Sequence, residues 1–154
     1  MDLLVKILIA FVLLSAVLYG VSCNLVRDTS DAERIADHFY SMIQANDFRS
    51  TIELYEPEFF VDNHIPPVNW VERQKNMHEK LGPMVEYKLM NWKEQGETQT
   101  GEPGTFYQLN YLVTYANDTT TETFIMKKEK DSNKIQILRR NVNPTRLYLE
   151  PAYE

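Results

Sequence analysis

Residues 106–115 read FYQLNYLVTY, and this stretch decides what kind of fold the chain adopts. Large apolar or aromatic side chains stand at every second position, and most of the residues between them are polar. Successive side chains of a β-strand point to opposite faces, so a period of two predicts a strand with one apolar face. We therefore expect a long strand with Tyr107, Tyr111 and Tyr115 on the same face.

The same period continues on both sides of this stretch. It predicts further strands over residues 85–92, 121–128 and 135–142, with a polar loop over 93–104 and turns at 117–118 and 130–133. Because short turns connect the last three strands, we expect these strands to pair antiparallel.

Helical periodicity precedes the strands. Apolar residues recur at steps of three and four over residues 31–45, over a shorter second segment that stops near Pro57, and from Pro66-Pro67 to Leu81. Gly82-Pro83 ends the third helix, because glycine provides the left-handed cap and proline blocks continuation. Helices followed by an antiparallel sheet predict an α+β fold with three N-terminal helices and about four strands.

The N-terminus has the pattern of a targeting segment. Residues 7–20, ILIAFVLLSAVLYG, carry no charge, and the small residues Gly20 and Ser22 stand where a signal peptidase accepts them. The single cysteine of the chain, Cys23, follows at once and looks like the lipidated cysteine of a bacterial lipoprotein. Three alternatives stay open: a lipid anchor at Cys23, a cleaved secreted protein, and an uncleaved membrane helix.

The domain organisation follows from this pattern. We expect a signal peptide or anchor over residues 1–22, a tether over 23–29, a folded domain over 30–143 and a tail over 144–154. All three alternatives place the folded domain outside the cytoplasm, in the cell envelope or secreted. The predicted partner is therefore a membrane, reached through an N-terminal lipid or helix.

Composition and charge exclude several classes of function. The chain has 154 residues and a net charge of −6, which disfavours binding to nucleic acid. One cysteine excludes an internal disulfide and a Cys-rich zinc site, and we expect neither a metal triad nor a cofactor. A small basic patch comprises Lys127, Lys128, Lys130, Arg139 and Arg140. We expect this patch to form a solvated sheet edge, or alternatively to face anionic lipid headgroups.

Several short motifs resemble the nuclear transport factor 2-like superfamily, and in particular its small exported members of unknown function. The motifs are Arg73 with Leu81-Gly82, the run Pro103-Gly104-Thr105-Phe106, and the pair Glu122-Thr123. The resemblance covers residues 28–143 and implies a cone, in which a curved sheet wraps the helices. It implies no single function, because this fold serves enzymes, binding modules and assembly domains.

Candidate site residues fall into two groups. Asp62 and His64, in the loop before the third helix, are the best acid–base pair, and an interior tyrosine such as Tyr111 could polarise a carbonyl. The second group would line an apolar pocket with hydroxyl groups, and it comprises Tyr107, Tyr111, Tyr115, Phe124 and Trp70. The stripe of aromatic residues on the strands has two other interpretations: it fills the core against the helices, or it forms a dimer surface on the sheet.

The sequence favours a binding or assembly role over catalysis. No convergent set of Asp, His and Tyr or Arg matches the known enzymes of the fold that the resemblance implies. We therefore expect a membrane-tethered, non-catalytic module, with a small apolar ligand or a second copy of the chain as candidate partners. The alternative is a small-molecule isomerase, dehydratase or hydrolase with its pocket inside the cone.

Overall fold

The computed structural model describes residues 30–96, 101 and 103–145. The chain divides into the units Met1–Asp31 and Ala32–Glu154, and the second unit carries the fold. The expectations for the signal segment, Cys23 and the tail after Thr145 lie outside the described residues. Within the described part of the chain, no helix is long and apolar enough to cross a bilayer.

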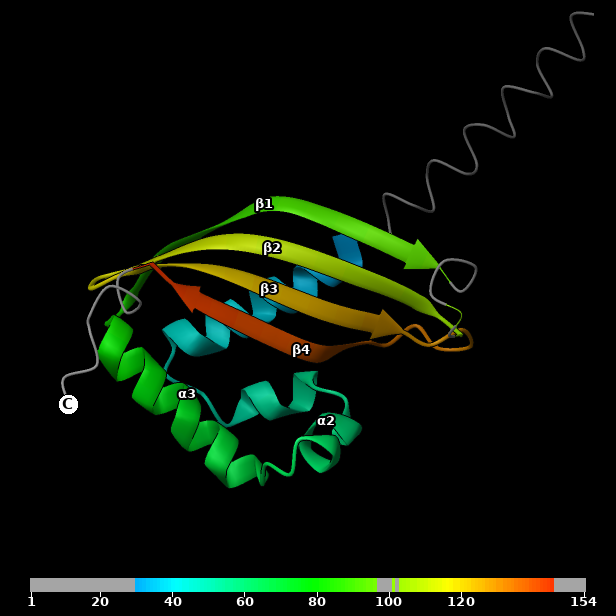
Figure 1. Cartoon of the computed structure of the whole chain (residues 1–154), viewed down its shortest axis with the longest axis horizontal. Helices are drawn as coiled ribbons and strands as arrows, with labels where there is room; N and C mark the ends of the chain where they lie inside the picture. Colours follow the sequence, from blue (N-terminus) through cyan, green and yellow to red (C-terminus); the bar gives the residue numbers. More distant parts are fainter. Residues whose placement is uncertain (1–29, 97–100, 102, 146–154) are drawn as a thin grey trace, which may run out of the picture. The chain divides into compact units, whose positions relative to one another are not determined.

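The elements occur in the predicted order, helices first and strands afterwards (Figure 1). A helix over residues 30–44 comes first. It is followed by η1 (Ser50–Leu54), a 3-10 helix, then by α2 (Pro57–Asp62), α3 (Pro67–Leu81), β1 (Met84–Gly96), β2 (Thr105–Tyr115), β3 (Thr119–Lys128) and β4 (Ile135–Pro144). The predicted α+β class is confirmed.

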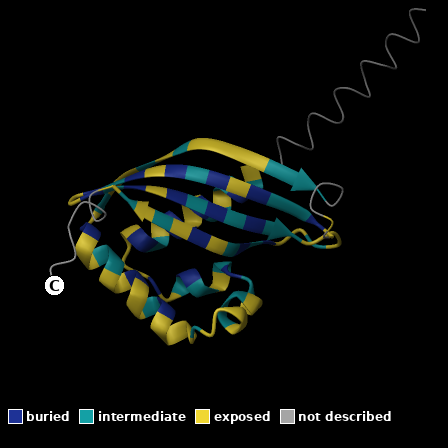
Figure 2. Cartoon of the chain, viewed as in Figure 1, coloured by how far each residue is buried: buried dark blue, intermediate teal, exposed yellow. Residues whose placement is uncertain are grey.

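The four strands form one antiparallel sheet in chain order, and the helices lie on one side of it (Figure 1). Along β2, buried and more exposed residues alternate as the period of two predicts (Figure 2). The buried face carries Tyr107, Tyr111 and Tyr115, which pack in the core with Phe39 and Phe124. Edge-to-face contacts between rings, such as 5.3 Å between the centroids of Phe39 and Phe124, join the first helix to the sheet.

Most element boundaries lie within two residues of the prediction, and two differ by more. The expected second helix is divided into η1 and α2, and α2 begins at Pro57 instead of stopping there. Proline is tolerated at the first helical position, and extended Glu56 precedes it as the N-cap. Strand β1 continues to Gly96, four residues into the expected loop, because Lys93 to Gly96 pair with the first residues of β2. The polar composition of these residues predicted a loop, but their hydrogen bonds to β2 make them part of the strand.

The first helix ends in a Schellman motif. Asn46 has a φ of 59°, in the left-handed region, and its N–H donates to the carbonyl of Ile43 at 3.0 Å. The N–H of Asp47 donates to the carbonyl of Met42 at 2.9 Å. These two bonds satisfy carbonyls that the end of a helix otherwise leaves without a donor. At the end of α3 the predicted glycine cap is present, with Gly82 at a φ of 79°.

The segment between η1 and α2 covers the edge of β4 that does not pair with β3. Tyr55 forms a parallel bridge with Ile137, and the Glu56 N–H donates to the carbonyl of Ile137 at 3.0 Å. Gln136 donates from Nε2 to the carbonyl of Tyr55 at 3.2 Å. This connection fixes η1 and α2 against the start of β4 and creates the pocket described next.

Candidate functional site

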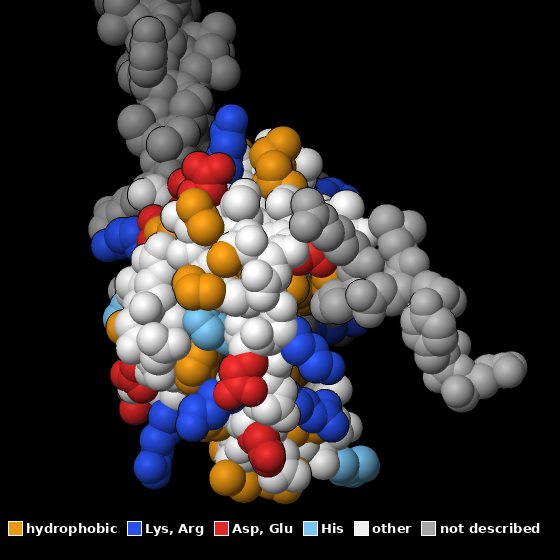
Figure 3. Space-filling view, turned by 90° about the vertical axis from the view of Figure 1, so that its left-hand side faces the viewer, with side chains coloured by type: hydrophobic (Ala, Val, Ile, Leu, Met, Phe, Trp, Pro, Cys, Tyr) orange, Lys and Arg blue, Asp and Glu red, His pale blue; other side chains and the backbone are white. Residues whose placement is uncertain are grey.

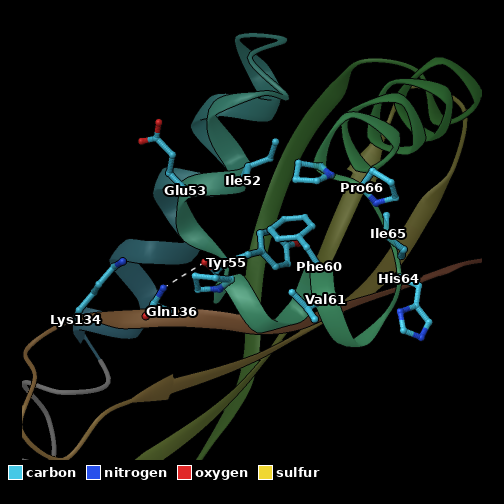
Figure 4. A pocket seen from close by; sticks show the side chains of 12 residues that line it. Ile52, Glu53, Tyr55, Phe60, Val61, His64, Ile65, Pro66, Lys134 and Gln136 are labelled. Atoms are coloured by element: carbon cyan, nitrogen blue, oxygen red, sulfur yellow. Dashed lines mark hydrogen bonds between the residues drawn. The ribbon is translucent and has the colours of Figure 1, made fainter.

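A pocket of about 740 Å³ opens between η1, α2, the start of α3 and the start of β4 (Figure 4). This volume is within the usual range for sites that bind small molecules. Most of the lining is apolar, and it comprises Ile52, Tyr55, Pro57, Phe60, Val61, Ile65, Pro66 and Pro67, with the polar residues Glu53, His64, Lys134 and Gln136.

The wall made by α2 and the following turn has a local cause in the sequence. The N–H of His64 donates to the carbonyl of Val61 at 3.1 Å, and that of Ile65 to the carbonyl of Phe60 at 3.1 Å. His64 reverses the chain with a φ of 51°, and Pro66-Pro67 then start α3. This tight reversal places Phe60 and Ile65 on the same side of the pocket.

Opposite charges balance at the rim. In Figure 4, Glu53 and Lys134 lie on one side of the pocket and His64 lies on the other. The amide of Gln136 already donates to the Tyr55 carbonyl, so one of its donors is engaged within the protein. An apolar lining with one acidic and one basic side chain favours a neutral ligand over a charged one.

The structure does not bring the candidate acid–base residues together in one site. His64 lines the pocket, whereas Asp62 is exposed at the end of α2 and is not among the lining residues. Tyr111 lies in the core, with its ring 5.2 Å from that of Tyr40 and 5.9 Å from that of Phe124. Burial raises the pKa of the Tyr111 hydroxyl, and the acidic Asp37 and Glu33 raise it further.

The residues predicted to line an apolar pocket lie in two parts of the fold. Tyr107, Tyr111, Tyr115 and Phe124 are on the covered face of the sheet, and Trp70 is on α3. All five are buried and belong to the hydrophobic core of the described residues. None of these five residues lines the 740 Å³ pocket, although Trp70 contacts the ring of Tyr55, which does, at 5.2 Å between centroids.

A buried charged network in the core was missed at the level of sequence. Glu122 has no exposed surface and accepts hydrogen bonds from Tyr40 at 3.1 Å, Tyr115 at 2.9 Å and Thr120 at 3.0 Å. Arg140 donates from Nε to Oε2 of Glu122 at 2.9 Å, and its Nη2 lies 2.7 Å from the same oxygen. The carboxylate is therefore enclosed on both oxygens.

Arg140 corrects the prediction of a basic patch on a solvated edge. Its side chain is buried instead, with the guanidinium carbon 4.7 Å from the centroid of the Phe39 ring. Nη1 donates to Oε1 of Gln74 on α3 at 2.9 Å. Among the other members of the expected patch, Lys127 pairs with Glu129 at 2.9 Å on the surface.

The interactions within the network favour the charged form of Arg140 and the protonated form of the two tyrosines. Burial and the negative Glu122 raise the pKa values of Tyr40 and Tyr115, so both hydroxyls stay protonated as donors. Burial disfavours the charged form of Arg140, but Glu122 and the tyrosines outweigh this effect and raise the pKa of the guanidinium. This buried network of hydrogen bonds therefore connects β3, β4, α3 and the first helix.

Outside the pocket, large hydrophobic side chains are exposed at scattered positions. They are Val68 on α3, Val85, Met90 and Trp92 on β1, and Leu112 on β2. On the face shown in Figure 3, hydrophobic side chains lie among side chains of both charges. Val68 also lines a smaller hollow of about 320 Å³, which shares Ile52 and Pro67 with the main pocket.

Within the described residues, no group of three or more His, Cys, Asp or Glu side chains is placed to hold a metal ion.

Comparisons of the chain with protein-family models, with curated proteins and with solved structures found no match. The site must therefore be interpreted from its own geometry, and the apolar pocket is the feature that the geometry supports best.

Proposed function

We propose that this chain is a non-catalytic binding module that holds a small, neutral, apolar ligand in the pocket between η1, α2, α3 and β4. The observation that carries the proposal is the apolar lining of a 740 Å³ pocket whose two rim charges, Glu53 and Lys134, have opposite signs. The buried Glu122 and Arg140 are engaged with each other, and a side chain with no exposed surface has no access to substrate. Binding explains this arrangement better than acid–base catalysis.

The curved sheet and its covering helices agree with the cone of the nuclear transport factor 2-like superfamily, and we propose that fold for residues 30–143. We further propose that the N-terminal segment exports the domain and tethers it to a membrane, through a lipid on Cys23 or through a helix. Mass spectrometry of protein purified from membranes tests the tether. A mass that begins at Cys23 and includes acyl chains supports the lipid anchor, and an unmodified full-length mass supports the helix.

Binding is tested with a neutral apolar dye, N-phenyl-naphthylamine, whose fluorescence rises in apolar surroundings. We expect saturable binding to the full chain and an affinity roughly five- to tenfold lower in Val61→Glu, because a charge replaces an apolar contact of about 1 kcal/mol. Val61 lines the pocket and the residue is 69% exposed, so the substitution does not disturb the core.

Val85→Glu is the matched control, since Val85 is 64% exposed on β1 and does not line the pocket. We expect this variant to bind the dye like the original protein. Equal loss in both variants, or the absence of saturable binding, would contradict the proposed function.

Pairing of two copies through the uncovered face of the sheet is a separate proposal. It is supported by Leu112, which lies on that face and is 40% exposed. The mass of the protein in solution tests it, with Leu112→Glu expected to dissociate a dimer.

A further inference from the structure

Two buried donor groups near the pocket have no hydrogen-bond partner among the described residues. They are the hydroxyl of Tyr55 and the indole N–H of Trp70. The two residues are 2% and 8% exposed. Buried donors are rarely left without an acceptor, so two on neighbouring side chains indicate a site for an acceptor atom.

The contacts place these donors in the same part of the core. The rings of Tyr55 and Trp70 meet edge to face at 5.2 Å, and Phe39 contacts both the Tyr55 ring at 6.5 Å and the Arg140 guanidinium at 4.7 Å. Arg140 is also hydrogen-bonded to Gln74, one turn of α3 after Trp70. The donors from α3 and from the junction between η1 and α2 therefore lie in one part of the core, near the guanidinium of Arg140.

The chemistry of these groups defines the class of ligand. An indole N–H only donates and the Arg140 guanidinium lies nearby, which excludes a metal cation or an ammonium group as the occupant. The charge of Arg140 is already compensated by Glu122, with 2.7 Å between Nη2 and Oε2. A carboxylate in the site would add an uncompensated buried negative charge, so a neutral oxygen fits best.

Tyr55 connects this region with the pocket, because its side chain both lines the pocket and contacts Trp70. We infer that Tyr55 and Trp70 form a polar recognition point for a neutral oxygen acceptor at the inner end of the pocket. The acceptor has two possible sources, an internal water and a carbonyl or hydroxyl oxygen of the bound ligand. The second source rests on the proposed function, whereas the first does not.

Three probes of one size separate these sources: methyl naphthyl ketone, ethylnaphthalene and naphthoate. Affinities are measured by calorimetry on the full chain, and the indole N–H signal of Trp70 is followed by NMR, with Trp92→Phe to assign it. We expect the ketone to bind roughly three- to tenfold more tightly than the hydrocarbon, to shift the Trp70 signal, and to bind more tightly than the carboxylate.

Tyr55→Phe removes one donor and keeps the ring, so it should abolish the preference for the ketone and leave the affinity for the hydrocarbon unchanged. Tyr87→Phe is the matched control, because Tyr87 stacks on Tyr40 at 4.3 Å on another side of the core, and it should keep the preference.

Magnetisation transfer from a long-lived water to the Trp70 indole tests the other source without any ligand. Equal affinities for ketone and hydrocarbon together with this transfer would support an internal water and overturn the ligand source. Equal affinities without the transfer would overturn the recognition point while the pocket remains. If no probe binds, the proposed function and the ligand source fail together, and the water signal alone decides whether the acceptor site exists.

Discussion

Replacing Glu122 by Gln should destabilise the fold severely. The substitution conserves shape but removes the charge that compensates buried Arg140, whose side chain contacts Glu122 through Nε and Nη2 at 2.9 and 2.7 Å. The amide oxygen must face Arg140, because guanidinium groups cannot accept a hydrogen bond. The amide nitrogen then meets Tyr115 and Thr120, which donate to Oε1 in the native protein and must reorient.

The magnitude follows from the burial of the pair. Removing one partner of a buried ion pair costs about 3–5 kcal/mol, a large part of the 5–15 kcal/mol that stabilises an ordinary domain. Urea unfolding followed by circular dichroism and tryptophan fluorescence measures this loss in the free energy of unfolding. The urea dependence itself should not change, because the core exposed on unfolding is the same.

Two controls make this prediction specific. Glu129→Gln removes an exposed carboxylate, 51% accessible and 2.9 Å from Lys127, and should cost less than about 1 kcal/mol. The double variant Glu122→Gln with Arg140→Met removes both buried charges and should recover much of the lost stability. If the Glu122→Gln protein were as stable as the Glu129→Gln protein, the reasoning would be refuted. Buried Arg140 would then not depend on the negative charge of Glu122.

Gly104→Ala should cost about 2 kcal/mol, because Gly104 has a φ of 109° and a β-carbon would lie 2.6 Å from the carbonyl oxygen of Lys128. Gly96→Ala, with nothing within 4 Å, should change stability little in the same urea experiment. Asn46→Ala should cost about 1 kcal/mol and Asn46→Gly should not, since φ is 59°. Buried tyrosines with raised pKa values stabilise the fold below the ordinary pKa of about 10, and this contribution is lost as the pH rises beyond it. Absorbance at alkaline pH should therefore show these tyrosines ionising only with unfolding, namely Tyr40, Tyr55, Tyr111 and Tyr115.

The order of elements was predictable because it depends on local patterns. The period of two over residues 106–115 placed the tyrosines on one face, and Pro66-Pro67 with Gly82 bounded α3 correctly. The division of the second helix at Pro57 could not be predicted from local patterns in the same way. A proline stops one helix or starts the next, and the choice depends on whether the preceding residue is extended.

Arg140 shows why the core network could not be found from alternation. Ile135 and Ile137 are buried on the inner face, and strict alternation would then send Arg140 outward. A register irregularity pairs Ile137 with Met126 and Arg139 with Ile125, so the intervening residue of β4 is unpaired and the side chains after it change face. Such a bulge depends on the partner strand, which periodicity within one strand does not reveal.

The pocket depends on contacts between distant segments. Its lining comes from residues 52–67 and from Lys134 and Gln136, which the bridge between Tyr55 and Ile137 brings together. His64 was predicted as a site residue from its loop position and does line the pocket, but the sequence could not show that Asp62 would remain outside it.

The covered edge of β4 also has a consequence for how copies of this protein coexist in a crowded compartment. Proteins aggregate through free strand edges, and within the described chain the edge that no other segment pairs with is that of β1. That strand has two register irregularities and carries the exposed cations Lys88 and Lys93, which oppose regular pairing with another strand. Copies at high concentration should therefore not join edge to edge through β1, although a long strand lies at the margin of the sheet.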